Sequence, residues 1–124
     1  MKVAIFENEF TAVKTSFDAY NLLYGNNELH YKPYASSQAF GDLSKLSEFD
    51  IVIVDIDLSL ASKMDGYQLL EEIEKLKLEN LKIVILTGHL TIKEKLAELG
   101  LPEYPIIPKP INLSRIKKAF EDSV

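Results

Sequence analysis

Three short runs of uninterrupted apolar residues stand out along the chain, at positions 3–6, 51–54 and 83–86. They are rich in Val and Ile and contain neither proline nor glycine. Such runs are typical of strands buried on both faces of a parallel sheet, because a half-exposed strand would alternate apolar with polar residues. Two weaker strand candidates, 29–34 and 104–107, each contain a proline. Proline cannot donate a backbone hydrogen bond to a neighbouring strand, so we expect these two strands at the edges of the sheet.

The segments between these runs carry apolar residues at the spacing of amphipathic helices. Ser36 or Ser37, Thr91 and Asn112 are suited to cap the starts of three of them, and Gly25 is suited to end the first. The predicted stripes are Val13, Phe17, Tyr20 and Tyr24, then Ala39, Phe40, Leu43 and Leu46, then Leu69, Leu70, Ile73 and Leu76, then Ile92, Leu96 and Leu99, and finally Leu113, Ile116 and Phe120.

Strands and helices therefore alternate five times along the chain. Right-handed crossovers place the helices on both faces of the sheet. With the second and fifth strands at the edges, the spatial order 2-1-3-4-5 follows, which is the flavodoxin-like, doubly wound α/β fold. We expect one domain over residues 1–124, with one long irregular connection, 56–65, after the third strand.

The composition narrows the classes of function. The net charge is −5 and the basic residues are scattered among acidic ones, so the chain lacks the basic face that nucleic-acid binding requires. There is no cysteine, which excludes disulfides and thiolate metal sites and fits a reducing cytoplasm. The apolar runs are too short to cross a bilayer, and the first residues predict a strand rather than a signal peptide. We therefore expect a cytoplasmic protein with neither nucleic-acid nor membrane partners.

Polar residues follow the predicted strands at the edge of the sheet where doubly wound folds bind ligands, beyond the carboxyl ends of the strands. The switch in strand order falls between the first and third strands, so we expect the groups that follow them to meet. The residues at this rim are Glu7, Asn8 and Glu9 after the first strand, Asp55 and Asp57 after the third, Thr87 after the fourth and Lys109 after the fifth.

These residue types together suit phosphoryl transfer. Clustered carboxylates repel one another unless a cation joins them, and their hard oxygen ligands suit Mg²⁺. The metal would also screen a carboxylate nucleophile from an incoming anionic phosphoryl group. Thr87 could hydrogen-bond one phosphoryl oxygen, and Lys109 could pair with another. Each residue taken singly is more often a solvated or capping group, and it is their combination on the correct strand ends that indicates a function.

The chain resembles response-regulator receiver domains, the CheY-like superfamily, over essentially its whole length. The resemblance rests on the acidic cluster after the first strand and on four further sites in the right order: Asp55, Asp65-Gly66, Thr87 and Lys109-Pro110. It implies a two-component phosphoprotein in which Asp55 accepts a phosphoryl group from a histidine kinase, a phosphotransfer protein or a small phosphodonor. Such a receiver signals to a downstream protein target by contact and is not an enzyme.

The resemblance implies that Mg²⁺ is held by Glu7, Asn8 and Asp55 and by the backbone carbonyl of Asp57. The family usually has a second acid where this chain has Asn8, and that acid normally touches the metal. Asn8 keeps an oxygen ligand but loses one negative charge, so we expect weakened Mg²⁺ binding, which Glu9 or Asp57 could partly offset.

The resemblance also implies that Thr87 and Lys109 contact the phosphoryl group and that the Lys109–Pro110 bond is cis. The family usually has an aromatic residue three positions before the lysine, which swings inward as the threonine moves. That position is Ile106 here, so the switch cannot operate in its ordinary form. His89, two residues after Thr87, is expected at the rim, where it could modulate the kinetics. The connection after Asp55 is longer than in typical receivers and carries an insertion around 58–63.

Two other functions compete with a phosphorylatable receiver. Asn8 in place of the family's acid and Ile106 in place of its aromatic residue favour a pseudo-receiver, an interaction module that works without phosphorylation. The Asp55-Ile56-Asp57 run also resembles the DxD motif of haloacid-dehalogenase-type phosphatases. That family has its motif near the start of the chain and an acidic pair ending a later strand, whereas this chain has only Glu121-Asp122 in its last predicted helix. Flavin or nucleotide binding is not indicated, because the sequence has no glycine-rich phosphate loop.

Overall fold

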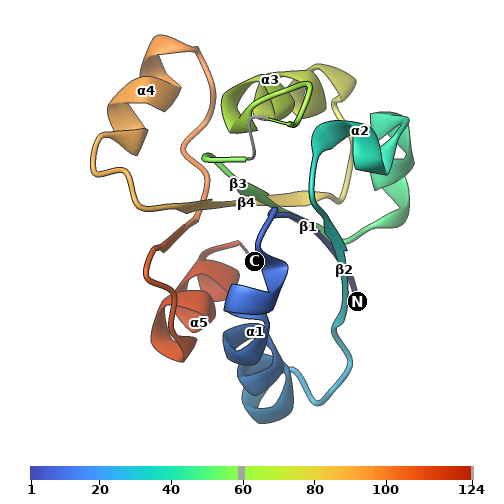
Figure 1. Ribbon diagram of the computed structural model, residues 1–124, viewed down its shortest axis with the longest axis vertical. Coiled ribbons are helices and arrows are strands. Elements are labelled where there is room, and N and C mark those ends of the chain that lie inside the picture. The colour runs from blue at the N-terminus through green and yellow to red at the C-terminus, as the bar shows by residue number, and fades with distance from the viewer. Residues whose placement is uncertain (59–60, 124) are drawn as a thin grey trace.

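The computed structural model describes residues 1–58 and 61–123, and its centre is a five-stranded parallel sheet with helices on both faces (Figure 1). The strand order is β2-β1-β3-β4-β5, and all neighbours are parallel, so the predicted doubly wound α/β fold is confirmed. The strands are β1 (Lys2–Phe6), β2 (His30–Tyr34), β3 (Ile51–Asp55), β4 (Lys82–Thr87) and β5 (Ile106–Pro108), and the helices are α1 (Phe10–Tyr24), α2 (Ser37–Phe40), α3 (Gly66–Leu76), α4 (Ile92–Glu98) and α5 (Leu113–Asp122), with a 3-10 helix η1 (Leu43–Glu48).

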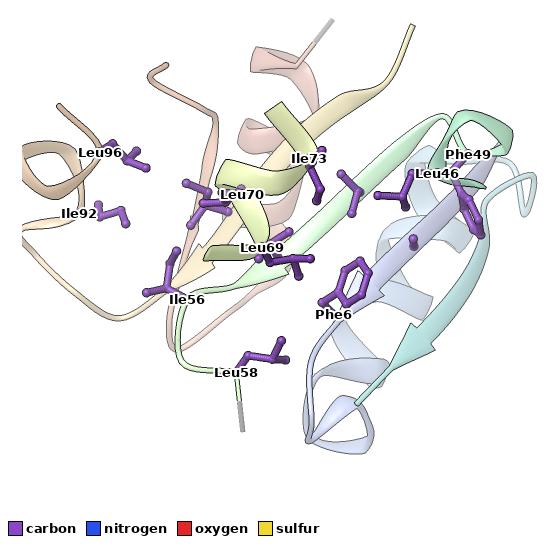
Figure 2. Close-up of a cluster of buried hydrophobic side chains, with 14 residues drawn as sticks. Phe6, Leu46, Phe49, Ile56, Leu58, Leu69, Leu70, Ile73, Ile92 and Leu96 are labelled. Carbon is purple, nitrogen blue, oxygen red and sulfur yellow. The ribbon is translucent and has the colours of Figure 1, made fainter. Parts of the chain in front are cut away.

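The sheet separates two hydrophobic cores. Helices α1 and α5 cover one face, and α2, α3 and α4 cover the other (Figure 1). Successive residues of a strand point to opposite faces, so Val3 and Ile5 enter the core under α1 and α5 while Ala4 and Phe6 enter the other. Figure 2 shows the second core, where Phe6 lies close to side chains from the helices and from the connection after β3. An uninterrupted apolar strand is thus what this two-sided burial requires.

Both edge strands contain a proline, but in β5 it is Pro108 and not the predicted Pro105, which precedes the strand. Pro33 lies in β2, in register with Ile5 of β1, and Pro108 ends β5. The last strand begins at Ile106, two residues later than the predicted 104–107, although the carbonyl of Pro105 still accepts a hydrogen bond from the backbone of Ile85 at 2.9 Å. The edge positions explain why the sheet tolerates residues that cannot donate to a ladder.

The prediction of one continuous second helix is wrong, because the segment forms two separate short helices. Ser36 caps α2 as expected, with its hydroxyl accepting from the backbone N–H of Ala39 at 3.2 Å. The helix then stops at Phe40, because Gly41 has a φ of 87°, a conformation that residues with a side chain rarely adopt. Asp42 caps the separate 3-10 helix η1, which supplies Leu46 to the core.

The remaining helix ends divide between confirmed and wrong predictions. Asn112 caps α5 through its side chain, which accepts from the backbone N–H of Arg115 at 2.9 Å, and Gly25 follows the last residue of α1. Thr91 precedes α4 but makes no side-chain capping bond, so its predicted role as a cap is wrong. Among the described residues, no helix has the length and apolar character needed to cross a bilayer.

Candidate functional site at the carboxyl edge of the sheet

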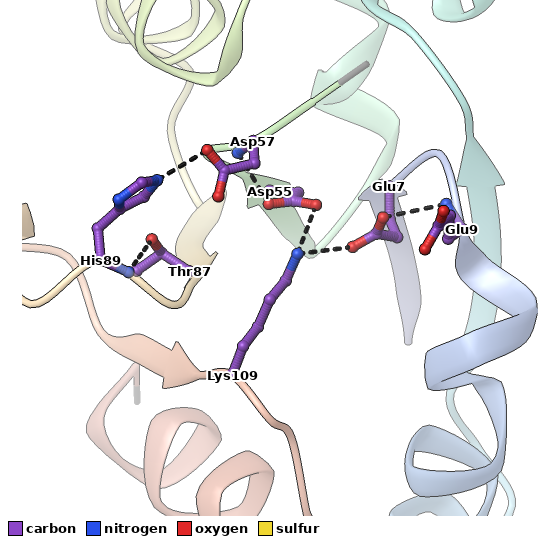
Figure 3. A network of polar contacts seen from close by, with 7 residues as sticks. All are labelled: Glu7, Glu9, Asp55, Asp57, Thr87, His89 and Lys109. Carbon is purple, nitrogen blue, oxygen red and sulfur yellow. Dashed lines mark hydrogen bonds and ion pairs between the residues drawn. The ribbon is translucent and has the colours of Figure 1, made fainter.

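The carboxyl ends of β1, β3 and β5 bring two carboxylates and an ammonium group together (Figure 3). Lys109, directly after β5, places its Nζ 2.9 Å from Oδ2 of Asp55 and 3.6 Å from Oε2 of Glu7. Lys109 is itself held by its backbone N–H, which donates to the carbonyl of Thr87 at the end of β4 at 2.9 Å. The Lys109–Pro110 bond is cis. Residues that are far apart in the sequence thus form one charged cluster, because all the strands end at the same edge.

The carboxylate of Asp55 is buried and has a separate partner for each oxygen. Its exposed fraction is 1%, and Oδ1 accepts from the backbone N–H of Asp57 at 2.9 Å while Oδ2 accepts from Lys109. The backbone after Asp55 continues the sheet, since the N–H of Ile56 donates to the carbonyl of Leu86 at 3.1 Å. The carboxylate is therefore held in one orientation.

Glu7 is a second buried acid beside Asp55. The pKa of Glu7 is raised to about 7, first by burial and then by the hydrogen bond with Asp55, while the bond from the backbone of Glu9 and the charge of Lys109 lower this pKa by less. Burial also acts to lower the pKa of Lys109, but the hydrogen bond and the charges of Asp55 and Glu7 outweigh it, so that this pKa is raised. The ammonium group of Lys109 therefore does not fully offset the cost of burying two neighbouring carboxylates, and further positive charge would favour their ionised state.

The predicted metal-binding residues divide into those that meet and those that do not. Glu7 and Asp55 lie together, Asn8 is exposed beside Glu7, and the side chain of Asp57 turns away to His89. In residues 1–58 and 61–123, no three His, Cys, Asp or Glu side chains form a ready-made metal cluster. Two buried carboxylates that repel each other nevertheless fit a hard cation, which would stabilise both in the ionised state.

Thr87 and His89 form the opposite wall of the site. Thr87 is 2% exposed, and its hydroxyl accepts from the backbone N–H of His89 at 3.0 Å. Accepting a bond uses an oxygen lone pair, so the hydroxyl hydrogen can be donated elsewhere. The imidazole Nε2 of His89 lies 2.7 Å from Oδ1 of Asp57, a pairing the sequence analysis missed. The available signal was that each residue stands two positions beyond the end of neighbouring strands.

Residues 18–121 match the sequence model of the response regulator receiver domain. The chain belongs to this family. Receiver domains generally act as signalling modules that interact with kinases and downstream effectors, and phosphorylation and Mg²⁺ are typical of them. No curated protein matches the chain significantly by sequence.

Solved structures agree with this receiver fold. The receiver domain of NtrX from Brucella abortus is 21% identical with a TM-score of 0.71, over 98% of this chain and 96% of that one. The signal receiver domain of the DNA binding response regulator protein merR from Colwellia psychrerythraea 34H is 20% identical with a TM-score of 0.72, over the same 98% and 96%. The chemotaxis protein CheY4 of Vibrio cholerae is 16% identical with a TM-score of 0.70, over 99% and 98%.

Gly66 lies directly against the backbone at the end of β3. A Cβ atom at this position would fall 2.6 Å from the carbonyl oxygen of Asp55 and 2.5 Å from Cα of Ile56. Asp65 precedes it as the cap of α3 in a reciprocal capping box with Gln68. Only glycine lets the helix start this close to the site, a reason that the sequence pattern alone did not provide.

Ile106 occupies the β5 position opposite Ile85 and is half-buried in the core under α3 and α4. Tyr104 lies outside the strand, and its hydroxyl donates to Oε2 of Glu74 on α3 at 2.6 Å. Burial and the neighbouring Glu74 raise the pKa of this hydroxyl. The nearest aromatic ring before Lys109 is therefore committed to α3 rather than placed beside Thr87.

Proposed function

We propose that this receiver accepts a phosphoryl group on Asp55 in a Mg²⁺-dependent reaction and signals through protein contacts. The observation that carries the proposal is the placement of Lys109 Nζ between Asp55 and Glu7, at the edge where the parallel strands end. A buried carboxylate paired with an ammonium group is suited to nucleophilic attack on an anionic group, because the cation offsets the repulsion between the two anions.

The reaction transfers one phosphoryl group. A carboxylate oxygen of Asp55 attacks phosphorus, the bond from phosphorus to the donor breaks, and the donor leaves with that electron pair. Lys109 then contacts a phosphoryl oxygen as well as the second oxygen of Asp55, and Thr87 donates its hydroxyl hydrogen to another phosphoryl oxygen. The side chain of Lys109 is 33% exposed, so it is partly accessible from solvent.

Mg²⁺ would be held by Glu7, Asp55 and the backbone carbonyl of Asp57, with Asn8 as a neutral oxygen ligand. When bound, it supplies positive charge against the two acids and the phosphoryl group. Glu9 is exposed and contributes its backbone N–H to Glu7 at 3.0 Å, which orients that acid. The partners that follow from this function are a histidine kinase or phosphotransfer protein and a downstream protein target, without turnover of a substrate.

A phosphorylation-independent interaction module is the second candidate. It is favoured by the neutral Asn8 and by the pairing of Asp57 with His89, which together leave the second acid of the family unreplaced. The two functions differ in whether Asp55 reacts.

Intact-mass measurement after treatment with an acyl phosphate tests the proposal. We expect the mass of one added phosphoryl group when Mg²⁺ is present, and loss of the addition with Asp55→Asn or with a chelator. Asp18→Asn is a matched control, because Asp18 is an exposed residue of α1. A chain that stays unmodified at saturating donor and Mg²⁺ would leave the interaction module as the function.

A further inference from the structure

The connection between β3 and α3 is hydrogen-bonded to the start of α2. The hydroxyl oxygen of Ser62 accepts from the backbone N–H of Ser37 at 2.8 Å, and the hydroxyl oxygen of Ser37 accepts from the backbone N–H of Met64 at 3.1 Å. Ser37 is buried, with an exposed fraction of 4%, so these bonds are shielded from competing water. These two bonds join residues that are separated by 25 and 27 positions in the sequence.

Gln38 holds the residues on either side of Ser62. Its side-chain Nε2 donates to the carbonyl of Ala61 at 2.7 Å, and its Oε1 accepts from the backbone N–H of Lys63 at 2.8 Å. Both ends of one amide group are thus used on the same short segment. We call the contacts of Ser37 and Gln38 with residues 61–64 the loop clamp. The clamp holds residues 61–63 of the predicted 58–63 insertion, of which residues 59 and 60 lie outside the described residues.

The clamped segment leads directly into α3, whose first residue packs against the backbone of Asp55. Met64 is half-buried in the core, Asp65 caps α3, and Gly66 begins it. Because a Cβ atom on Gly66 would fall 2.6 Å from the carbonyl of Asp55, the start of α3 cannot move toward β3. The clamp therefore supports, through two intervening residues, the backbone that carries the reactive carboxylate.

We propose that Gln38 and Ser62 are positioning residues for the turn formed by residues 55–57. This inference rests on the proposed function, since the turn supplies Asp55, the Asp57 N–H that orients its Oδ1, and the Asp57 carbonyl. Holding residues 61–64 against α2 fixes the start of α3. Gly66 at the start of α3 packs against the backbone of the turn and so limits its movement. Groups that bind a metal or a reacting atom depend on this kind of support, because small displacements cost affinity and rate.

A purely structural role for the clamp predicts a different result. The clamp also satisfies the backbone N–H of Ser37 at the start of α2, so its loss would destabilise that helix in any case. Ser36 separates the two roles. Its hydroxyl caps the same helix by accepting from Ala39 at 3.2 Å and makes none of the clamp bonds to residues 61–64.

The test compares Gln38→Ala and Ser62→Ala with Ser36→Ala in the full chain. Amide hydrogen exchange of Asp57, followed by NMR without metal, reports on the turn. NMR titration with Mg²⁺ and the rate of modification by an acyl phosphate report on the site. We expect exchange of the Asp57 amide to be roughly tenfold faster and Mg²⁺ binding to be roughly threefold to tenfold weaker in both clamp variants. Ser36→Ala should leave both quantities within about twofold of the unmodified chain.

Three results would overturn the inference. The first is unchanged Asp57 exchange in both clamp variants, and the second is the same acceleration in Ser36→Ala. The third is faster exchange with unchanged Mg²⁺ affinity and modification rate, which would make the clamp structural only. Gln38 is exposed, so Gln38→Ala keeps the test valid if Ser62→Ala fails to fold. Failure of the proposed function is distinguishable, because the unmodified chain itself would then take no phosphoryl group.

Discussion

His89 and Asp57 are joined by a contact of 2.7 Å between Nε2 and Oδ1 that links the loops after β4 and β3 at the mouth of the site. Both side chains are about half exposed, so the pair contributes little to the free energy of unfolding, on the order of 0–1 kcal/mol. Its effect is on the direction of the Asp57 carboxylate, which it keeps turned away from Glu7 and Asp55.

His89→Ala should therefore strengthen Mg²⁺ binding. Without the imidazole, the Asp57 carboxylate can rotate toward the two buried acids and replace the charge that the family's second acid would supply. We expect roughly a threefold tighter dissociation constant, measured by NMR titration. His30→Ala is the control, because His30 is exposed on the edge strand β2. Equal affinities in the two variants would mean that Asp57 acts through its backbone alone.

Asn8→Asp should also strengthen Mg²⁺ binding, by roughly tenfold, because an anionic oxygen replaces a neutral one beside Glu7. Asn8 is exposed, so the fold should tolerate the change. Calorimetric titration with Mg²⁺ measures the effect, and Asn8→Ala shows what the amide itself contributes. A Mg²⁺ affinity that is the same in all three chains would place residue 8 outside the metal site.

The buried acid Glu7 should make stability depend on pH when Mg²⁺ is absent. Its pKa is about 7 in the folded chain against an ordinary 4.5, so the folded state binds a proton that the unfolded state has released between these values. Its contribution to the free energy of unfolding is therefore complete below 4.5 and is lost as the pH rises through about 7. The loss should be about 3 kcal/mol.

Urea unfolding across this pH range, with Glu7→Gln as the reference, measures the effect. The variant cannot ionise at this position, so its stability should change less with pH. Saturating Mg²⁺ should flatten the dependence of the unmodified chain, because a bound dication stabilises the ionised acid. If the free energy of unfolding changed with pH in the same way in both chains, Glu7 would not be the cause of the pH dependence.

Gly66→Ala should destabilise the fold by about 3 kcal/mol, at the upper end for overpacking, because the new Cβ atom would collide with backbone that cannot move aside. Gly88→Ala is the matched control, since its Cβ atom would meet only the Cβ of Lys109, at an ordinary 3.7 Å. Urea unfolding of both variants provides the comparison. Similar losses would mean that the start of α3 has room to shift.

The strands and the meeting of Glu7, Asp55 and Lys109 could be predicted because they follow from sheet topology. A buried parallel strand needs an uninterrupted apolar run, and parallel strands end at one edge. The end of α2 could not be predicted in the same way, because the apolar stripe continues through Gly41 and the helix ends on a backbone angle. The loop clamp and the pairing of His89 with Asp57 depend on how close separate loops approach, which local spacing does not encode.

The two prolines at the margins of the sheet have a consequence for how the protein associates. Pro33 and Pro108 each remove an amide hydrogen from an outermost strand, and β5 is only three residues long. An approaching polypeptide therefore finds no complete row of donors and acceptors to extend. Binding proteins must engage helices and loops instead, and neighbouring copies have little opportunity to join edge to edge into a continuous β structure.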